Sequence, residues 1–304
     1  MNAVREYDLL VTGDVCCDMI FSKIDSFPTY GTEVRADKLK ITVGGIFNVA
    51  AAASRLGLRV AMPCVLGTDV FSNIIRKAIR REKICREFVR EVDRHYDQVS
   101  VVLNYGFERA FVSYAEKSET SMVEEYLKII QSHTVRALAV CPTPDERILE
   151  VIRMARAKGT IIVMDCFWDE KLMKSNLIRE QMKLADYFMP NAMEACCVSG
   201  EEILVKALKK LAEMTPQPVI KNGHHGILWD DHGVIRDMEA VQLGETIDPT
   251  GAGDNFIAGF IYGLLRGYSF TKCLRCGVIC GAKTVLSLSG YEGSIRQDEL
   301  EALL

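Results

Sequence analysis

The sequence lacks an excess of positive charge. Its 304 residues include 37 lysines and arginines against 41 aspartates and glutamates, which gives a formal net charge of −4. The basic residues form no dense cluster anywhere along the chain. Because nucleic-acid binding depends on clustered Lys and Arg side chains that neutralise phosphates, we predict no nucleic-acid partner.

Long hydrophobic runs are also missing. No run approaches the roughly 18–20 residues that a membrane-spanning helix needs, although 49% of all residues are hydrophobic. The first residues, "MNAVREYDLLVTGD", lack the charged and then apolar layout of a secretion signal. We therefore expect no membrane partner and a cytoplasmic location.

The eleven cysteines lack the spacing of a disulfide framework or of a zinc site. Two pairs, at 16–17 and 196–197, are adjacent in sequence, and adjacent cysteines rarely bridge each other without strain. Cys273, Cys276 and Cys280 recur at helical spacing, but a zinc site needs four ligands and no second cluster accompanies them. We interpret these three as small buried side chains in a reducing compartment.

What the chain does contain is an alternation of apolar strands and amphipathic helices. Strands are predicted at 7–13, 58–67, 136–140 and 160–165, and helices at 48–57, 71–83 and 146–159. Such alternation is typical of a parallel sheet that helices cover on both sides.

Two stretches break this alternation. Residues 19–43 are typical of short strands and turns, and residues 99–116 of a hairpin around Gly106. We expect them to form a small β-sheet that projects from the main domain. The chain has no low-complexity stretch and no linker long enough to separate domains, so we predict a single domain over residues 1–304.

The stretch "IDPTGAGDNFIAGF" (247–260) has three glycines, two of them between the acids Asp248 and Asp254, and then continues as a hydrophobic helix. A helix that starts in the glycine run offers free backbone N–H groups and the positive end of its dipole. Gly251, Ala252 and Gly253 could therefore hold a phosphoryl group, and Asp254 could take a proton from a hydroxyl that attacks it. The alternative is that Asp254 only caps the helix and the glycines only form a turn.

This stretch resembles the second signature of the PfkB, or ribokinase-like, carbohydrate kinases. Asp248, Gly251, Ala252, Gly253 and Asp254 all match that signature. The resemblance implies a three-layer α/β/α sandwich with a mainly parallel sheet and a small β-sheet lid, here formed by segments at about 19–43 and 97–116. It also implies that Asp254 is the catalytic base and that the backbone of 251–253 forms an anion hole.

The first family signature supplies the expected substrate site. Asn48 matches it, but only two residues separate it from the pair Gly44 and Gly45, where the family usually has three, so either the turn is shorter or Val43 replaces the first glycine. Asp18 matches the acid that binds sugar hydroxyls, and a carboxylate can accept two such hydrogen bonds. Asp14 is a second carboxylate near the same place, with a turn or cap as its alternative role.

Two further motifs resemble the nucleotide site of the family. The resemblance assigns to nucleotide binding Asn191 and Glu194, Lys221 with Gly223 and Gly226, and Thr250. Glu194 would organise Mg²⁺ through water, and Asp248 would lie at a monovalent cation site, for example for K⁺. A capping box explains Asn191 and Glu194 equally well without any ligand. We interpret His224 and His225, between the two glycines, as exposed turn residues.

Together these features predict an ATP-dependent kinase that phosphorylates a primary hydroxyl of a small sugar or polyol, as a homodimer that pairs through its lids. One alternative is a nucleoside kinase of the same fold. Another, from a different class, is a non-catalytic sugar-sensing protein, which the retained Asp254 opposes. A dinucleotide-dependent oxidoreductase would need a Gly-x-Gly-x-x-Gly motif after the first strand, and "GDVCCD" lacks it.

Overall fold

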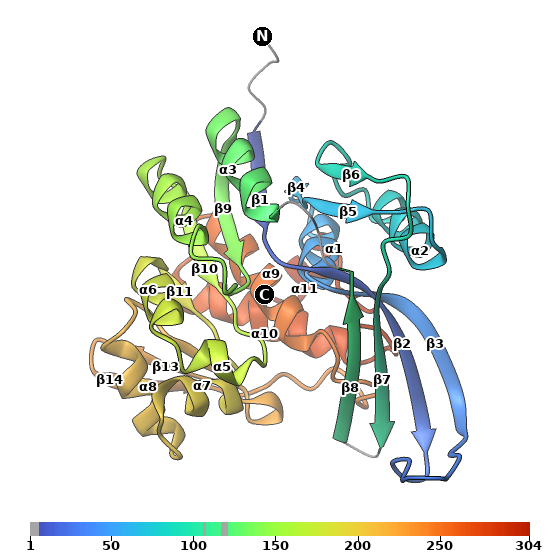
Figure 1. The fold of residues 1–304 in the computed structure, drawn as a ribbon. Helices are drawn as coiled ribbons and strands as arrows, with labels where there is room; N and C mark the ends of the chain where they lie inside the picture. Colours follow the sequence, from blue (N-terminus) through green and yellow to red (C-terminus); the bar gives the residue numbers. More distant parts are fainter. Residues whose placement is uncertain (1–5, 106–107, 117–120) are drawn as a thin grey trace.

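The computed structural model describes residues 6–105, 108–116 and 121–304. Its centre is a sheet of parallel strands in the order β11-β10-β9-β1-β4 (Figure 1). The strands are β1 (Glu6–Val11), β4 (Val60–Ala61), β9 (Thr134–Val140), β10 (Ile161–Met164) and β11 (Tyr187–Phe188). The predicted parallel sheet is therefore confirmed.

Helices cover both faces of this sheet. Side chains of β1 alternate between two hydrophobic cores, with Leu9 in one and Leu10 in the other. The first core holds α1 (Phe47–Arg55), α2 (Val70–Arg81), α9 (Ala252–Leu265) and α10 (Phe270–Thr284). The second core holds α3 (Met122–Ser132), α4 (Ile148–Ala157), α6 (Asn176–Leu184), α7 (Ala192–Ser199) and α8 (Leu204–Ala212). The result is a three-layer sandwich.

The small residues of α9 and α10 let these two helices approach closely. A Cβ atom added to Gly259 would lie 2.6 Å from Cys280 Sγ and 2.7 Å from the Cys276 carbonyl oxygen. Cys273, Cys276 and Cys280 are all buried. They fill the contact as small side chains, and all eleven cysteines of the chain are free thiols.

Smaller elements complete the sandwich. An antiparallel sheet of β12 (Val219–Lys221), β13 (Ile227–Asp231) and β14 (Val234–Met238) meets the edge of the central sheet, where Phe188 pairs with Pro218. The remaining elements are β5 (Cys64–Leu66), β6 (Val89–Glu91), α5 (Glu170–Met173), the short 3₁₀ turn Gly223–His225 and α11 (Gln297–Leu303). The prediction of one continuous strand over 58–67 was wrong. The structure has two strands there, β4 and β5, which are separated at Pro63 because proline has no N–H to donate to a sheet.

The two segments that broke the alternation lie together in a separate four-stranded sheet. Its order is β3-β2-β7-β8, from β2 (Val15–Ile24), β3 (Ala36–Gly45), β7 (Gln98–Tyr105) and β8 (Glu108–Ala115). The first segment forms two ten-residue strands rather than the short strands expected. The hairpin of β7 and β8 agrees with the prediction, although Gly106 at its turn lies outside the described residues.

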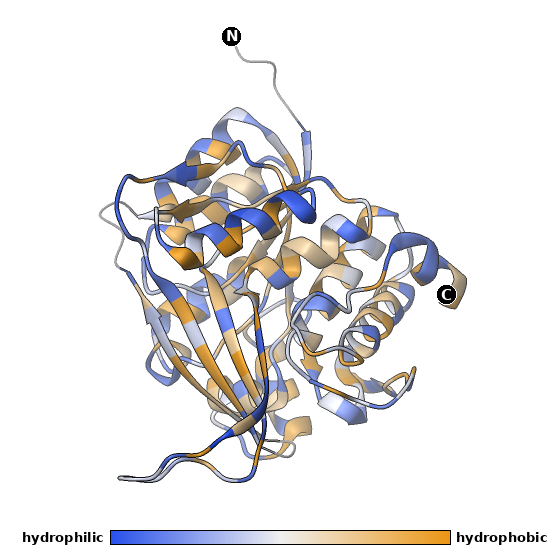
Figure 2. Ribbon diagram, turned by 90° about the vertical axis from the view of Figure 1, so that its right-hand side faces the viewer, coloured by the Kyte–Doolittle hydropathy of each residue, from blue (hydrophilic) through white to orange (hydrophobic). Residues whose placement is uncertain are grey.

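Hydrophobic residues run along the strands of this sheet (Figure 2). The register aligns four of them in one row across all four strands: Ile41, Met19, Val101 and Val112. Ile41 and Val112 are 45% and 69% exposed. This face of the sheet is therefore apolar and open to solvent in one copy of the chain.

Within the described ranges, no helix has the length and hydrophobicity that crossing a bilayer requires.

Candidate active site

The proposed site residues gather where strands of the central sheet end. Gly13 and Asp14 follow β1, Asp165 follows β10, and Asn191 follows β11. Parallel strands place their carboxyl ends along one edge of a sheet, which is where open α/β proteins bind ligands.

The start of α9 is where the sequence predicts an anion hole. Gly251 is the N-cap residue with φ 78°, a left-handed conformation that glycine adopts without strain, and Ala252 and Gly253 begin the helix. A Cβ atom on Gly253 would lie only 3.1 Å from Lys221 Nζ. Ala252 N donates to the Pro249 carbonyl oxygen at 3.3 Å, so the backbone N–H groups of Gly251 and Gly253 are the ones that could receive a ligand. These groups, the helix dipole and the Lys221 ammonium group meet at one point, which suits a phosphoryl group.

Asp254 lies in the first turn of α9 and is held by α1. Asn48 Nδ2 donates a 2.9 Å hydrogen bond to Asp254 Oδ2. Asn48 itself is buried, at 4% exposure, whereas Asp254 is partly accessible. The two predicted residues are therefore brought together, and the carboxylate keeps an oriented, accessible edge.

Asp18 lies on β2, close enough to Asp254 for the two charges to interact. Burial raises the pKa of Asp18 to about 6, and the charges of Asp254 and Asp248 add to the shift, while a hydrogen bond from the Cys16 thiol opposes it. Gly44 is needed beside it, because a Cβ atom there would lie 1.9 Å from Asp18 Oδ2. Any larger residue at position 44 would therefore clash with the Asp18 carboxylate.

Asp14 and Gly45 lie next to each other at the mouth of the same site. Gly45 has φ 65°, and a Cβ atom on it would lie 2.2 Å from the Asp14 carbonyl oxygen. The Asp14 side chain is exposed, yet surrounding protein atoms raise the pKa of its carboxyl. A carboxyl group that is both accessible and desolvated fits the wall of a concavity.

Lys221 belongs to the site through a partner that the sequence did not reveal. Its Nζ lies 2.6 Å from Asp165 Oδ1, and both side chains are largely buried. Burial opposes the charge of Lys221, but Asp165, Glu194 and Asp254 together raise its pKa. The one available sequence signal for Asp165 was its position directly after a buried strand.

Asn191 and Glu194 form the capping box that was the alternative to a ligand role. Asn191 N donates to Glu194 Oε2 at 2.8 Å, and Glu194 N donates to Asn191 Oδ1 at 3.0 Å. Asn191 also pairs with Lys221 between strand ends, and burial raises the pKa of Glu194. The cap and a position beside the phosphate site therefore coexist.

The remaining nucleotide residues lie in two turns. Gly226 has φ 83° and packs against backbone, since a Cβ atom would lie 2.0 Å from the Met238 carbonyl oxygen. Gly223 opens the 3₁₀ turn with φ 57°, and His224 and His225 are exposed there, as expected for turn residues. No described contact joins Gly223 or Gly226 to Asp254.

Asp248 and Thr250 precede the anion hole. Asp248 is fully buried, and its Oδ1 accepts hydrogen bonds from Thr250 N at 3.0 Å and Thr250 Oγ1 at 2.7 Å. Its Oδ2 is buried and has no hydrogen-bond partner among the described residues. A buried carboxylate oxygen left in this way fits a bound cation, because an uncompensated charge is costly in the interior.

Gly290 is the second residue that the sequence reading missed. A Cβ atom on Gly251 would lie 2.0 Å from the Gly290 carbonyl oxygen, and one on Gly290 would lie 2.5 Å from Asn48 Oδ1. The segment around Gly290 therefore packs against both the anion hole and the residue that holds Asp254.

Comparison with known proteins shows the family of the chain. The model of the pfkB family of carbohydrate kinases matches residues 7–297. The chain belongs to this family. Members of the pfkB family are ATP-dependent phosphotransferases, so the chain is an enzyme of that class rather than a sugar sensor.

Several relatives of this pfkB-family kinase cover nearly its whole length. A ribokinase from Haemophilus influenzae is 27% identical over 97% of the chain and 98% of its own length. A cytidine kinase from Thermococcus kodakarensis is 26% identical over 89% and 93%. The structure of Arabidopsis thaliana ribokinase complexed with ribose and ATP has a TM-score of 0.83 at 19% identity, over 98% of each chain, and so shares the fold.

The raised pKa of Asp18 predicts a pH-dependent cost in stability. Because the folded chain binds the proton more tightly than the unfolded one, this contribution favours folding below about pH 4 and is lost as pH rises through about 6. The variant Asp18→Asn removes the charge, so its stability relative to wild type should rise by about 1 kcal/mol between pH 5 and pH 8.

Urea unfolding at both pH values measures this difference. The matched control is Asp25→Asn, which makes the same change at an exposed residue. A stability difference between Asp18→Asn and wild type that stays constant from pH 5 to pH 8 would contradict a desolvated Asp18.

Proposed function

We propose that this kinase transfers the γ-phosphoryl group of ATP to a primary hydroxyl of a small sugar or sugar-like polyol, with Asp254 as general base. The observation that carries the proposal is the position of Asp254, which Asn48 orients beside the backbone N–H groups of Gly251 and Gly253. Asp18 lies close enough for its charge to interact with that of Asp254. One group can then accept the hydroxyl proton while the amides receive the developing negative charge.

The substrate side is assigned to Asp18, with Gly44, Gly45, Asn48 and Asp14 around it. Asp18 would accept hydrogen bonds from two hydroxyls, and the two glycines let a substrate approach the backbone. A thiol, Cys16, donates to Asp18 at 3.3 Å. The nearby charges that act on Asp18 come from Asp254 and Asp248, and no described cation is among them. Such a site suits a neutral polyol rather than an anionic substrate.

The nucleotide side is assigned to Lys221, Asn191, Glu194 and Thr250, with the turn of Gly223 and Gly226. Lys221 would contact the phosphates, since its ammonium group lies beside Gly253. Glu194 would hold Mg²⁺ through water, and its Oε1 takes no part in the capping box. When bound, Mg²⁺ supplies positive charge to the phosphates.

The second candidate is a nucleoside as phosphoryl acceptor. The relative named cytidine kinase supports this alternative, because it matches this chain about as well as the ribokinase does. Both substrates present a primary hydroxyl on a ring with further hydroxyls. The proposed chemistry at Asp254 is the same for either one.

The first functional prediction concerns the base. Asp254→Asn should lower kcat by about 100- to 1,000-fold or more, because the loss falls on the transition state, and it should leave ATP affinity almost unchanged. ADP release is measured with ATP, Mg²⁺ and a panel of acceptors: ribose, fructose, cytidine, inosine and 2-dehydro-3-deoxygluconate. The acceptor that wild type phosphorylates identifies the substrate class.

Asp298→Asn is the matched control, since it makes the same change on the surface helix α11. If Asp254→Asn retained more than about a tenth of wild-type turnover, the assignment of the base would be wrong.

A second functional prediction concerns the cation. We propose that Asp248 Oδ2 contacts a monovalent cation such as K⁺, because that oxygen is buried without a partner just before Gly251. Replacing K⁺ by tetramethylammonium, which is too large for the site, should lower wild-type kcat and thermal stability. The variant Asp248→Asn should lose this dependence, whereas equal melting temperatures of wild type in both salts would contradict the site.

We further propose that the kinase is a homodimer through the four-stranded sheet, which then serves as a lid over the substrate. The row of Ile41, Met19, Val101 and Val112 gives that sheet an apolar outer face that a second copy can cover with two-fold symmetry.

Light scattering at micromolar concentration tests the dimer. The expected mass is about twice the 34.0 kDa of one chain, because an isologous contact pairs two copies. Val112→Lys should shift the mass to that of a monomer, and Ser113→Lys, which points to the opposite face, should not. A monomeric and fully active wild type would rule out the dimer.

A further inference from the structure

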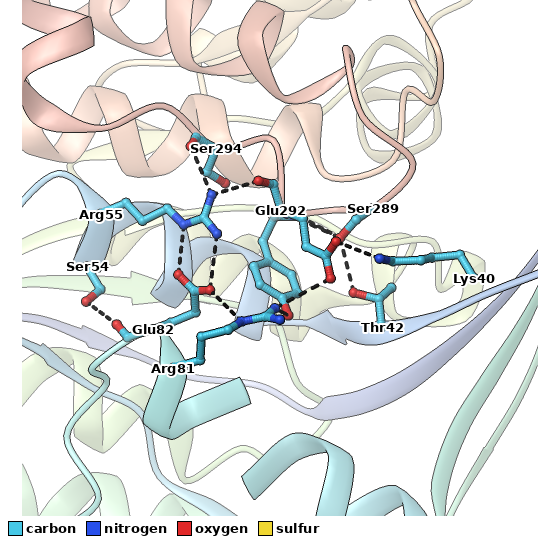
Figure 3. A network of polar contacts seen from close by, with 10 residues as sticks. Lys40, Thr42, Ser54, Arg55, Arg81, Glu82, Ser289, Glu292 and Ser294 are labelled. Atoms are coloured by element: carbon cyan, nitrogen blue, oxygen red, sulfur yellow. Dashed lines mark hydrogen bonds and ion pairs between the residues drawn. The ribbon is translucent and has the colours of Figure 1, made fainter. Parts of the chain in front are cut away.

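The segment Ser289–Ser294, called the strap below, runs between the four-stranded sheet and the start of α9 (Figure 3). Two contacts join it to β3. Thr42 Oγ1 and Ser289 Oγ share a hydrogen bond of 3.1 Å, and Lys40 Nζ lies 2.7 Å from Glu292 Oε2. The strap is therefore attached to a strand of the proposed lid.

The strap is also fixed to α1 and α2. Arg55 Nη1 donates to the carbonyl oxygens of Glu292 and Ser294 at 2.8 and 3.1 Å, and its Nε bonds Glu82 at 2.8 Å. Arg81 donates to the hydroxyl of Tyr291. These buried and half-buried bonds give the strap a defined position relative to the sandwich.

Gly290, in the middle of the strap, packs tightly against Gly251 and Asn48. Asn255 Nδ2 donates to the Gly290 carbonyl oxygen at 2.9 Å and to the Gly251 carbonyl oxygen at 2.8 Å. Gly290 leaves no space for a methyl group against Asn48, whose amide orients Asp254. A displacement of the strap must therefore move Gly251, Asn48 or both.

We propose that Lys40 and Glu292 are positioning residues that couple the lid strand β3 to the anion hole and to Asp254. The proposal rests on the function assigned above. While β3 lies in place, the ion pair holds the strap against Gly251 and Asn48. When β3 moves away, the strap loses its contacts with Lys40 and Thr42 and keeps only those with α1 and α2. The strap then holds Gly251 and Asn48 less firmly in the geometry for phosphoryl transfer.

The ion pair suits this role because it holds little of the stability of the fold. The Lys40 and Glu292 side chains are 35% and 29% exposed, and ion pairs with such exposure contribute little to folding. Breaking the pair should therefore change the position of the strap and leave the protein folded. Lys40→Met is the cleaner cut, since Glu292 also lies 3.5 Å from Arg81.

The first test measures turnover of the acceptor that wild type phosphorylates. Lys40→Met and Glu292→Gln should each lower kcat by about three- to thirty-fold, with the KM for ATP unchanged. The kcat of the double variant should be no lower than that of the less active single variant, because both substitutions remove the same contact. Lys38→Met removes a charge two residues along the same strand and is the matched control, with wild-type kcat expected.

The second test needs no substrate. In the protein alone, Lys40→Met should speed hydrogen exchange of the amides in residues 251–255 by at least about threefold, with residues 161–164 of β10 unchanged. If the ion pair had only a structural role, its loss would leave hydrogen exchange unchanged in both segments or speed exchange in both.

Two outcomes overturn the coupling. One is a wild-type kcat for Lys40→Met in an assay where Asp254→Asn is inactive. The other is unchanged exchange at residues 251–255. An active Asp254→Asn would instead remove the proposed base, and the exchange result would still decide whether Lys40 holds the strap.

Discussion

The hydrogen bond between Asn48 and Asp254 is the contact on which the proposed site depends. It joins α1 to α9 across 206 residues of sequence, and it fixes the carboxylate beside the backbone N–H groups of Gly251 and Gly253 at the start of α9. The glycines around it follow from this contact. Gly251 and Gly290 have no room for a side chain, because the two segments must pass each other to bring Asn48 to Asp254.

Charge organises the rest of the site. Acidic groups surround it from several elements, and burial raises the pKa of Asp14, Asp18 and Glu194. Lys221 stands among them, paired with Asp165. This arrangement costs stability in the absence of ligands, since desolvated carboxylates repel each other. It is useful for a phosphoryl-transfer enzyme, because a polyol, a cation and the phosphates each meet the group that complements them.

The four-stranded sheet has two different faces because strands alternate their side chains. One face carries Asp18 toward the proposed active site, and the other carries the apolar row of Met19 and its neighbours. The strap connects this sheet to α9 through β3. Substrate binding, subunit pairing and the anion hole thus share one structural element, which gives lid position a physical route to the catalytic groups.

The sequence by itself determined the sandwich, the extra sheet and most of the candidate site, since these follow from local periodicity and from short glycine-rich motifs. Asp254, Asn48, Asp18 and Lys221 could be named because each lies in a short motif that resembles one of the family. Asp165 and Gly290 could not, because their roles arise from contacts with residues 35 positions away or more. Only the tertiary structure decided how the strands and helices pack against one another. That packing determines that Asp165 is the carboxylate that pairs with Lys221 and that Gly290 is the glycine that packs against Asn48.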